Sequence, residues 1–196
     1  MANVVLSGVG GQGVLTLAAL IGSAAIFDGY EVRMSEVHGM AQRGGQVVCH
    51  VKYGAKVYSP LVMEGTADLI VALEASEALR VAHYLKARGA IIINNLELPP
   101  PLAVIKGVKY PNLKTIVEEL SKITGKVYVV NAQEIAKTVG SLNVVNTIML
   151  GASWATGELD VSENSLIKAI VSRFGEKWKD INVKAFKEGV KAVSKG

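Results

Sequence analysis

Two glycine-rich segments carry most of the residues in this sequence that are suited to chemistry. The first, GVGGQG, matches G-x-G-x-x-G through Gly8, Gly10 and Gly13. Glycines let the backbone approach a ligand closely, and a helix that begins after such a loop offers free N–H groups to a phosphate. The motif therefore predicts a phosphate or pyrophosphate ligand. The structural alternative is a turn needed only for tight packing between a helix and a strand.

The second segment, SEVHGMAQRGG, begins at Ser35 and holds Glu36, His38, Gln42 and Arg43. A guanidinium is planar and permanently charged, so Arg43 is suited to bind a phosphate or a carboxylate. His38 titrates near neutral pH when unperturbed, which suits proton transfer. The segment is a catalytic loop, a ligand clamp or a partner surface. The structural alternatives are an ion pair between Glu36 and Arg43 and a hydrogen-bonded loop histidine.

A βαβ unit is expected to position the first segment. NVVLSG predicts a buried strand, a helix is expected from about Val14 to Phe27, and YEVRMSEV predicts a second strand. In dinucleotide enzymes an acidic residue after the second strand binds the ribose, and Glu36 lies near that place. A self-contained NAD(P)-linked oxidoreductase is therefore an alternative, although Glu36 lies slightly late and Gln12 adds a polar side chain to the loop. The glycine motif alone does not distinguish NAD, coenzyme A and other nucleotides.

The remaining sequence predicts further alternation of strands and helices. QVVCHVKYG and AKVYSP predict a β-hairpin around residues 53–56. ADLIVALE, AIIINN and KVYVVNA predict strands, and SEALRVAHYLKARG and NLKTIVEELSKITG predict helices, the first with Ser76 as its N-cap. The expected fold class is α/β: a three-layer, Rossmann-like, mostly parallel sheet with a β-hairpin insertion and a helical C-terminal third.

The C-terminal helices are expected from about residue 133 onward. Asn131 and Glu134 form a capping pair that would open the first of them, and Gly151 and Gly157 are expected to break it. The whole chain, 1–196, is expected to form a single domain.

Composition excludes several classes of protein. A hydrophobic content of 50% and a charged content of 19% exclude a disordered chain. The net charge of +4 is spread along the sequence, which argues against nucleic-acid binding, and the longest apolar run is too short to span a membrane. The single cysteine, Cys49, favours a reducing, cytoplasmic compartment and cannot by itself hold an iron–sulfur cluster. Three scattered histidines do not suggest a metal site.

The two glycine-rich segments, in this order and spacing, resemble the γ-type domain of the 2-oxoacid:ferredoxin oxidoreductases. The resemblance rests on GVGGQGVLTLAALIGSAA followed by SEVHGMAQRGGQVVCHVKYG, with ADLIVALEASEALR and NVVNTIMLGA further along, and it spans roughly Asn3 to Gly151. The form HGMAQRGG is typical of the β subunit of the indolepyruvate-type members.

The resemblance implies a reaction in which an aryl-2-oxoacid, coenzyme A and oxidised ferredoxin give an aryl-acetyl-CoA, carbon dioxide and reduced ferredoxin. It places thiamine diphosphate and [4Fe–4S] clusters on a large α subunit, in a heterodimer or heterotetramer, and the sequence here has no recognisable thiamine motif. The chain alone is expected to be inactive and to hold no catalytic residue and no metal. The residues expected to contact a coenzyme A phosphate are Gly8, Gly10, Gly11, Gly13 and Arg43. The residues expected at the junction with the α subunit are Gln12, Glu36, His38 and Gln42.

Overall fold

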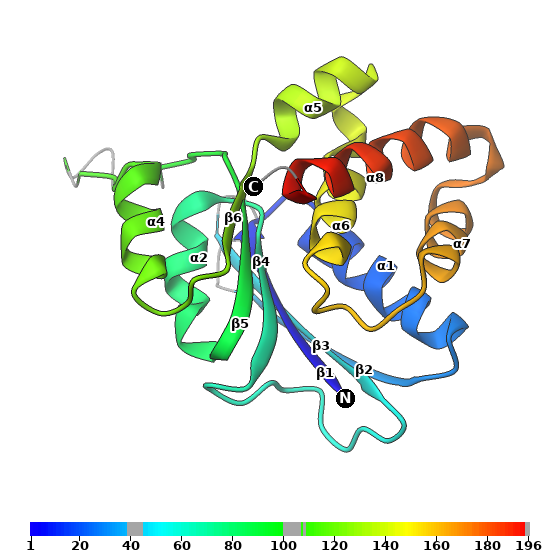
Figure 1. Cartoon of the computed structure of the whole chain (residues 1–196), viewed down its shortest axis with the longest axis horizontal. Coiled ribbons are helices and arrows are strands. Elements are labelled where there is room, and N and C mark those ends of the chain that lie inside the picture. The colour runs from blue at the N-terminus through cyan, green and yellow to red at the C-terminus, as the bar shows by residue number, and fades with distance from the viewer. Residues whose placement is uncertain (39–44, 100–106, 108, 195–196) are drawn as a thin grey trace.

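The fold is a six-stranded sheet covered by helices on both faces, so that the molecule has three layers (Figure 1). The computed structural model describes residues 1–38, 45–99, 107 and 109–194. The strand order is β2-β3-β1-β4-β5-β6. The strands are β1 (Ala2–Val9), β2 (Glu31–His38), β3 (Gln46–Gly54), β4 (Ala67–Ala72), β5 (Leu85–Asn94) and β6 (Val127–Val130). β1, β4, β5 and β6 are parallel, and β3 is antiparallel to both β1 and β2. The expected three-layer α/β class is confirmed.

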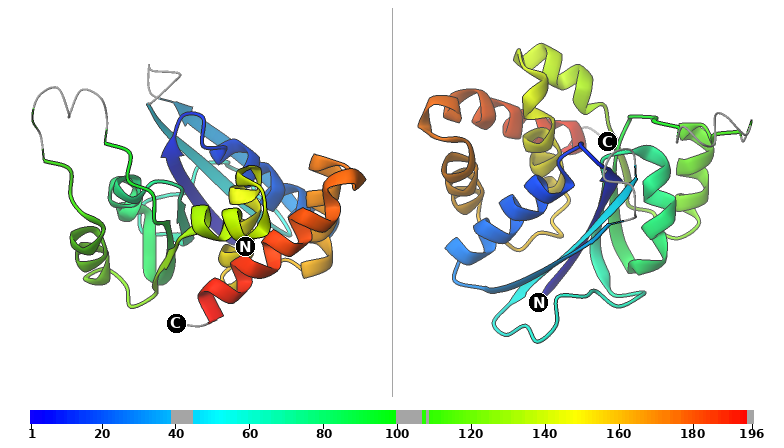
Figure 2. Two further views of the ribbon diagram at one scale, coloured as in Figure 1. Left: turned by 90° about the horizontal axis from the view of Figure 1, so that it is seen from above. Right: turned by 180° about the vertical axis from the view of Figure 1, so that it is seen from behind.

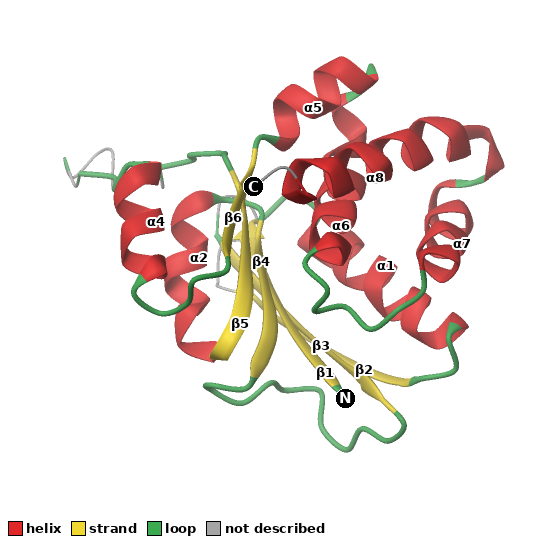
Figure 3. Cartoon of the chain, viewed as in Figure 1, coloured by secondary structure: helices red, strands yellow, loops and turns green. Residues whose placement is uncertain are grey.

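The helices divide between the two faces of the sheet (Figures 2 and 3). One face carries α1 (Val14–Phe27), α5 (Ala132–Val139), α6 (Val145–Ala155), α7 (Glu163–Phe174) and α8 (Lys179–Ser194), and the other carries α2 (Ala75–Val81) and α4 (Leu113–Ser121). Short 3₁₀ helices lie at Ala82–Tyr84, Leu142–Val144 and Glu176–Trp178. Within the described residues, none of these helices combines the length and apolarity needed to cross a membrane.

Each face of the sheet has its own hydrophobic core. In β1, Val4 and Leu6 contribute to the core under α1, whereas Val5 contributes to the core under α2. A strand that is buried on both faces requires a continuous apolar run rather than an alternating one, which is why Val4, Val5 and Leu6 are consecutive apolar residues.

The partner strand predicted for β3 from the sequence is wrong. β3 does form a hairpin, but it pairs with β2, and residues 55–66 make an irregular connection to β4. The reason is burial: Val47 and Cys49 face one core and Val48 faces the other, so β3 needs a central position between β1 and β2. In contrast, Tyr58 in the segment AKVYSP is 84% exposed.

The helix predicted over SEALRVAHYLKARG is shorter than expected. α2 ends at Val81, and Leu85 already begins β5. The register of β5 against β4 shifts at its start, and a Cβ on Gly89 would lie 3.0 Å from the carbonyl oxygen of Ala67. The sequence LKARG favours a helix by propensity, but the close approach of β5 to β4 decides its conformation. The expected N-cap is also wrong, because Glu74 and not Ser76 caps α2.

The C-terminal third is helical from Ala132, close to the expected start. The Asn131 side chain accepts a hydrogen bond from the Glu134 backbone N–H at 3.3 Å, so Asn131 is the N-cap as predicted, whereas the Glu134 carboxylate accepts from Lys137 Nζ at 2.8 Å. Gly157 lies just beyond α6 with φ of 77°, as a terminating glycine should. Gly151, however, lies inside α6 and does not break it.

Candidate functional site

The GVGGQG loop connects the carboxyl end of β1 to α1, and Gln12 closes it. The Val9 backbone N–H donates to Gln12 Oε1 at 2.7 Å, and the Gln12 backbone N–H donates to the Val9 carbonyl at 3.1 Å. The Gly10 N–H donates to the Gly45 carbonyl at 2.9 Å, which ties the loop to the chain just before β3. Gln12, expected at the subunit junction, therefore uses its side-chain oxygen to hold the loop itself, while its Nε2 is buried without a partner.

The glycines of this loop have different structural roles. A Cβ on Gly8 would lie 2.7 Å from Gln12 Oε1, and a Cβ on Gly13 would lie 2.1 Å from Asn146 Nδ2. Gly11 has φ of 99° and open space around it. Close packing therefore explains why position 8 is glycine and is one reason for glycine at position 13. Gly11 instead faces open space, which would leave room for a ligand.

A groove of about 360 Å³ opens over the loop and the first turn of α1. It is lined by Val9, Gly10, Gly11, Gly13, Val14, Leu15, Thr16 and Val47. Gly13 is the N-cap of α1 and supplies no side-chain hydrogen bond, and the first turn carries no acidic residue. The N–H groups and partial positive charge of this helix end are thus available to an anion.

A buried carboxylate, Glu74, marks the carboxyl end of the neighbouring strand β4. It is fully buried, and Oε2 accepts from Ser76 Oγ at 2.7 Å and from the Glu77 N–H at 3.0 Å. Oε1 accepts from the Leu98 N–H at 3.1 Å and from the Tyr110 hydroxyl. Burial and the bond to Glu74 raise the pKa of Tyr110, so the phenol stays a donor. This group was not predicted from the sequence, although an acidic residue close to the end of a buried strand was the available signal.

Glu77, three residues along α2, is a second buried carboxylate at this edge. Oε1 pairs with Arg80 Nε at 3.0 Å, and Oε2 is buried without a hydrogen-bond partner. Burial raises the pKa of Glu77, with a smaller contribution from the charge of Glu74, while the ion pair with Arg80 opposes the shift. The Ser7 hydroxyl donates to the Glu77 backbone carbonyl at 3.2 Å, so this part of α2 lies beside the carboxyl half of β1.

We expect Glu77→Gln to flatten the pH dependence of stability. A raised pKa means that the native state binds the proton more tightly than the unfolded chain, so the free energy of unfolding falls as pH rises through the raised pKa. Urea midpoints measured between about pH 4 and about pH 7 should therefore fall less in the variant than in the wild type. Glu134→Gln removes an exposed carboxylate that is also paired at i,i+3, with Lys137, and it should leave the wild-type slope intact. Equal slopes in wild type and Glu77→Gln would contradict the assignment.

The other predicted site residues lie on or beyond β2. Glu36 pairs with Cys49 of β3, which pairs in turn with Leu6 of β1. Glu36 is therefore two strand spacings, about 9.6 Å, from β1, and level with Leu6, which lies shortly before Gly8. An acidic ribose ligand of a dinucleotide enzyme would lie on the strand next to β1, so this geometry does not support the NAD reading. Burial, with a smaller contribution from Glu36, raises the pKa of Cys49 to about 12.

His38 ends β2 opposite Val47, and its side chain lies outside the described part of the structure. Gln42 and Arg43 also lie outside the described residues. The ion pair between Glu36 and Arg43 and the contact of Arg43 with a phosphate therefore stay predictions.

The fold is that of an α/β chain with a glycine loop and an uncapped helix N-terminus at the carboxyl end of a parallel strand. The family model described as pyruvate ferredoxin/flavodoxin oxidoreductase matches residues 3–192. The chain belongs to this family, and the resemblance found in the sequence is confirmed.

Proteins of similar sequence carry a more specific name. The chain is 42% identical over 195 residues to the indolepyruvate oxidoreductase subunit IorB of Thermococcus kodakarensis, covering 97% of this chain and 95% of the relative. It is 40% identical over 194 residues to the subunit of the same name from Archaeoglobus fulgidus, covering 99% and 96% of the two chains.

Two solved structures share the fold. The γ subunit of a keto/oxoacid ferredoxin oxidoreductase from Geobacter sulfurreducens superposes with a TM-score of 0.72 at 24% identity, over the full length of both chains. The 2-oxoglutarate:ferredoxin oxidoreductase of Magnetococcus marinus, with 2-oxoglutarate, coenzyme A and succinyl-CoA bound, gives a TM-score of 0.73 at 19% identity. That match covers all of this chain and 31% of the other.

Proposed function

We propose that this chain is the small subunit of an indolepyruvate-type 2-oxoacid:ferredoxin oxidoreductase and works only within a larger complex. The observation that carries the proposal is its near full-length similarity, at 40 to 42% identity, to subunits named for indolepyruvate oxidoreductase. The complex would convert an aryl-2-oxoacid and coenzyme A to an acyl-CoA and carbon dioxide and pass the electrons to ferredoxin. The core under α1 draws residues from along the chain, from Ala2 to Val193, and this supports treating the chain as a single domain.

The glycine loop is proposed to bind a phosphate of coenzyme A. The uncapped N-terminus of α1 offers N–H donors, and the groove above Gly10 and Gly11 gives a phosphate access to them. The helix dipole adds a favourable interaction with an anion. In this arrangement the chain binds and orients coenzyme A, and the carbon chemistry takes place on the partner subunit.

The redox and thiamine cofactors are proposed to lie on that large subunit. A [4Fe–4S] cluster is held by several cysteine thiolates, and this chain has a single cysteine. Burial raises the pKa of the Cys49 thiol to about 12, so it stays protonated and is unsuited to bind a metal. A single reduced thiol also supports a cytoplasmic setting.

Co-expression with a large subunit that carries thiamine and ferredoxin-type cysteine motifs tests the proposal. The purified complex should reduce ferredoxin with indolepyruvate and coenzyme A, and faster than with phenylpyruvate, pyruvate or 2-oxoglutarate. The small chain alone should give no turnover. Turnover by the isolated chain would refute its accessory role, and a preference for pyruvate or 2-oxoglutarate would refute the indolepyruvate assignment.

A pair of variants at Gly11 tests where coenzyme A binds. Gly11 has φ of 99° and open space around it, and asparagine and aspartate are the side chains that best tolerate this conformation. Gly11→Asp would place a negative charge beside the proposed phosphate, whereas Gly11→Asn has nearly the same shape and no charge. We expect the KM for coenzyme A to be about 10-fold higher in the aspartate variant than in the asparagine variant, which corresponds to about 1.4 kcal/mol. The KM for the 2-oxoacid should be the same in both, and equal KM values for coenzyme A would place its phosphates elsewhere.

A further inference from the structure

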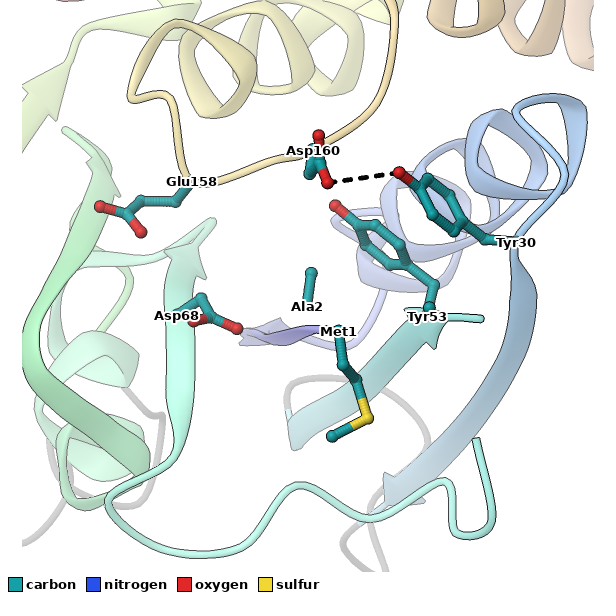
Figure 4. Close-up of a pocket in the computed structure, with 8 residues that line it drawn as sticks. Met1, Ala2, Tyr30, Tyr53, Asp68, Glu158 and Asp160 are labelled. Carbon is teal, nitrogen blue, oxygen red and sulfur yellow. Dashed lines mark hydrogen bonds between the residues drawn. The ribbon is translucent and has the colours of Figure 1, made fainter. Parts of the chain in front are cut away.

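A second pocket lies beside the N-terminal end of β1, whereas the glycine loop follows the C-terminal end of that strand. It is lined by Met1, Ala2, Tyr30, Tyr53, Gly54, Asp68, Glu158 and Asp160 and has a volume of about 170 Å³ (Figure 4). Ala2 begins β1 and the glycine loop follows its end, so the two sites are separated by the strand, about 23 Å.

The walls of this pocket are fixed by contacts outside it. Glu158 and Asp160 lie in the connection between α6 and α7, and polar contacts hold this connection near both of its ends. Lys126 Nζ pairs with Glu158 Oε1 at 2.7 Å, and the Ser162 N–H donates to Asp28 Oδ2 at 2.6 Å. The pocket is therefore pre-formed, so a ligand would not have to order this connection on binding.

Tyr53 supplies a buried polar group that points into the pocket. The side chain is 1% exposed, and its hydroxyl oxygen has no hydrogen-bond partner. Figure 4 shows the hydroxyl directed towards Asp160. Burial raises the pKa of this phenol, and the nearby Asp160 backbone N–H opposes the shift without reaching hydrogen-bond geometry. A neutral hydroxyl that is buried without a partner is costly unless a ligand or water completes it.

The carboxylates of the pocket differ in how they are neutralised. Asp68 pairs with Lys86, and Glu158 pairs with Lys126 and lies 3.8 Å from Lys86. Asp160 instead accepts a hydrogen bond from the Tyr30 hydroxyl at 3.2 Å, and it takes part in none of the ion pairs among the described residues. The carboxylate without an ion pair among the described residues is therefore the one next to the Tyr53 hydroxyl.

The three carboxylates do not converge on one point. Figure 4 shows Asp160 beside the two tyrosines, while Glu158 and Asp68 lie at the other end of the pocket. Within the described residues, no three acidic, histidine or cysteine side chains are arranged to hold a metal ion. The arrangement at Asp160 matches an organic cation with N–H donors, since one carboxylate and one hydroxyl together accept two hydrogen bonds.

We propose that this pocket binds a primary ammonium group on a short aliphatic chain, with the ammonium donating to Asp160 and to the Tyr53 hydroxyl. The volume corresponds to that of about five or six liquid waters, which accommodates an amine of about four carbons. The aliphatic chain lies in the remaining space, beside Ala2. This site is independent of the proposed coenzyme A loop.

Titration of the isotope-labelled full chain with n-butylamine, followed by NMR, tests this assignment. We expect saturable shifts of amides around Asp160 and Tyr53 with a Kd of about 1 mM, because a ligand of five heavy atoms has limited binding energy. 1-Butanol has the same chain without the charge, and it should give no saturable shifts there. Shifts from n-butylamine that match those from 1-butanol would overturn the proposal.

Three variants refine the test. Asp160→Asn keeps the shape of the side chain and removes its charge, and it should weaken n-butylamine binding more than 10-fold. Tyr53→Phe removes only the hydroxyl and should weaken binding about 5-fold, as the loss of one hydrogen bond predicts. Asp180→Asn removes an exposed carboxylate on α8 and should have no effect. Equal weakening by Asp160→Asn and Asp180→Asn, or unchanged binding to Tyr53→Phe, would overturn the assignment.

Discussion

Replacing Gly151 by alanine is expected to lower the free energy of unfolding by about 3 kcal/mol, at the upper end of the range for overpacking. A Cβ at this position would lie 2.0 Å from the carbonyl oxygen of Phe186 in α8. The obstacle is backbone, so no side-chain rotation relieves it, and α6 must move away from α8. Both helices contribute to the larger core, through Ile148 and Phe186 among others, and that core would open with them.

The contact is reciprocal, which gives a second test. A Cβ on Gly189 of α8 would lie 2.0 Å from the carbonyl oxygen of Ile148 in α6. Once one methyl group has separated the helices, the second meets less resistance, so the double variant Gly151→Ala/Gly189→Ala should lose less than the sum of the single losses.

Urea denaturation and thermal melting measure these changes. For a chain of this size, a loss of about 3 kcal/mol corresponds to a fall in Tm of about 6 to 12 °C. Gly125→Ala is the matched control: Gly125 has open space around it, and its variant should stay within about 0.5 kcal/mol of the wild type. If Gly151→Ala proved as stable as Gly125→Ala, the close crossing of α6 and α8 would be wrong.

Gly151 also illustrates what local sequence patterns can and cannot predict. A glycine within a helical pattern indicates a break, because it costs about 1 kcal/mol relative to alanine in a helix. Here the helix continues through Gly151, since only a hydrogen at this position lets α8 approach. That requirement comes from Phe186 in α8, which is distant from Gly151 in the sequence. By contrast, the N-cap Asn131 is correctly predicted, because a cap is formed by neighbours in the sequence.

The same distinction separates the predicted and the missed parts of the site. The glycine loop was predictable because the motif, the strand before it and the helix after it are contiguous. The hairpin partner of β3 was not, because the order of strands in the sheet depends on burial on both faces. Glu74 was missed for a related reason: its donors include Leu98 and Tyr110, which no local pattern connects to it.

Glu74→Gln is the second substitution expected to have a large effect, with a loss of about 3 kcal/mol in the free energy of unfolding. The carboxylate is fully buried and accepts four hydrogen bonds, two on each oxygen. Glutamine keeps the volume but replaces one acceptor oxygen by an NH₂ group, which would face two donors. Hydrogen bonds to a charged group contribute about 1.5–3 kcal/mol each, and buried donors left unpaired add to the loss.

Two further variants show whether the loss at Glu74 arises from these hydrogen bonds. Glu97→Gln is the matched control, because Glu97 is exposed and accepts one backbone bond, from the Leu113 N–H at 3.1 Å; it should cost at most about 0.5 kcal/mol. Tyr110→Phe removes one of the four donors, so the double variant with Glu74→Gln should be more stable than additivity predicts, by about 1 kcal/mol. Additive losses would mean that Tyr110 and Glu74 act separately. A Glu74→Gln protein as stable as Glu97→Gln would mean that this carboxylate does not hold together the end of β4 and the start of α2.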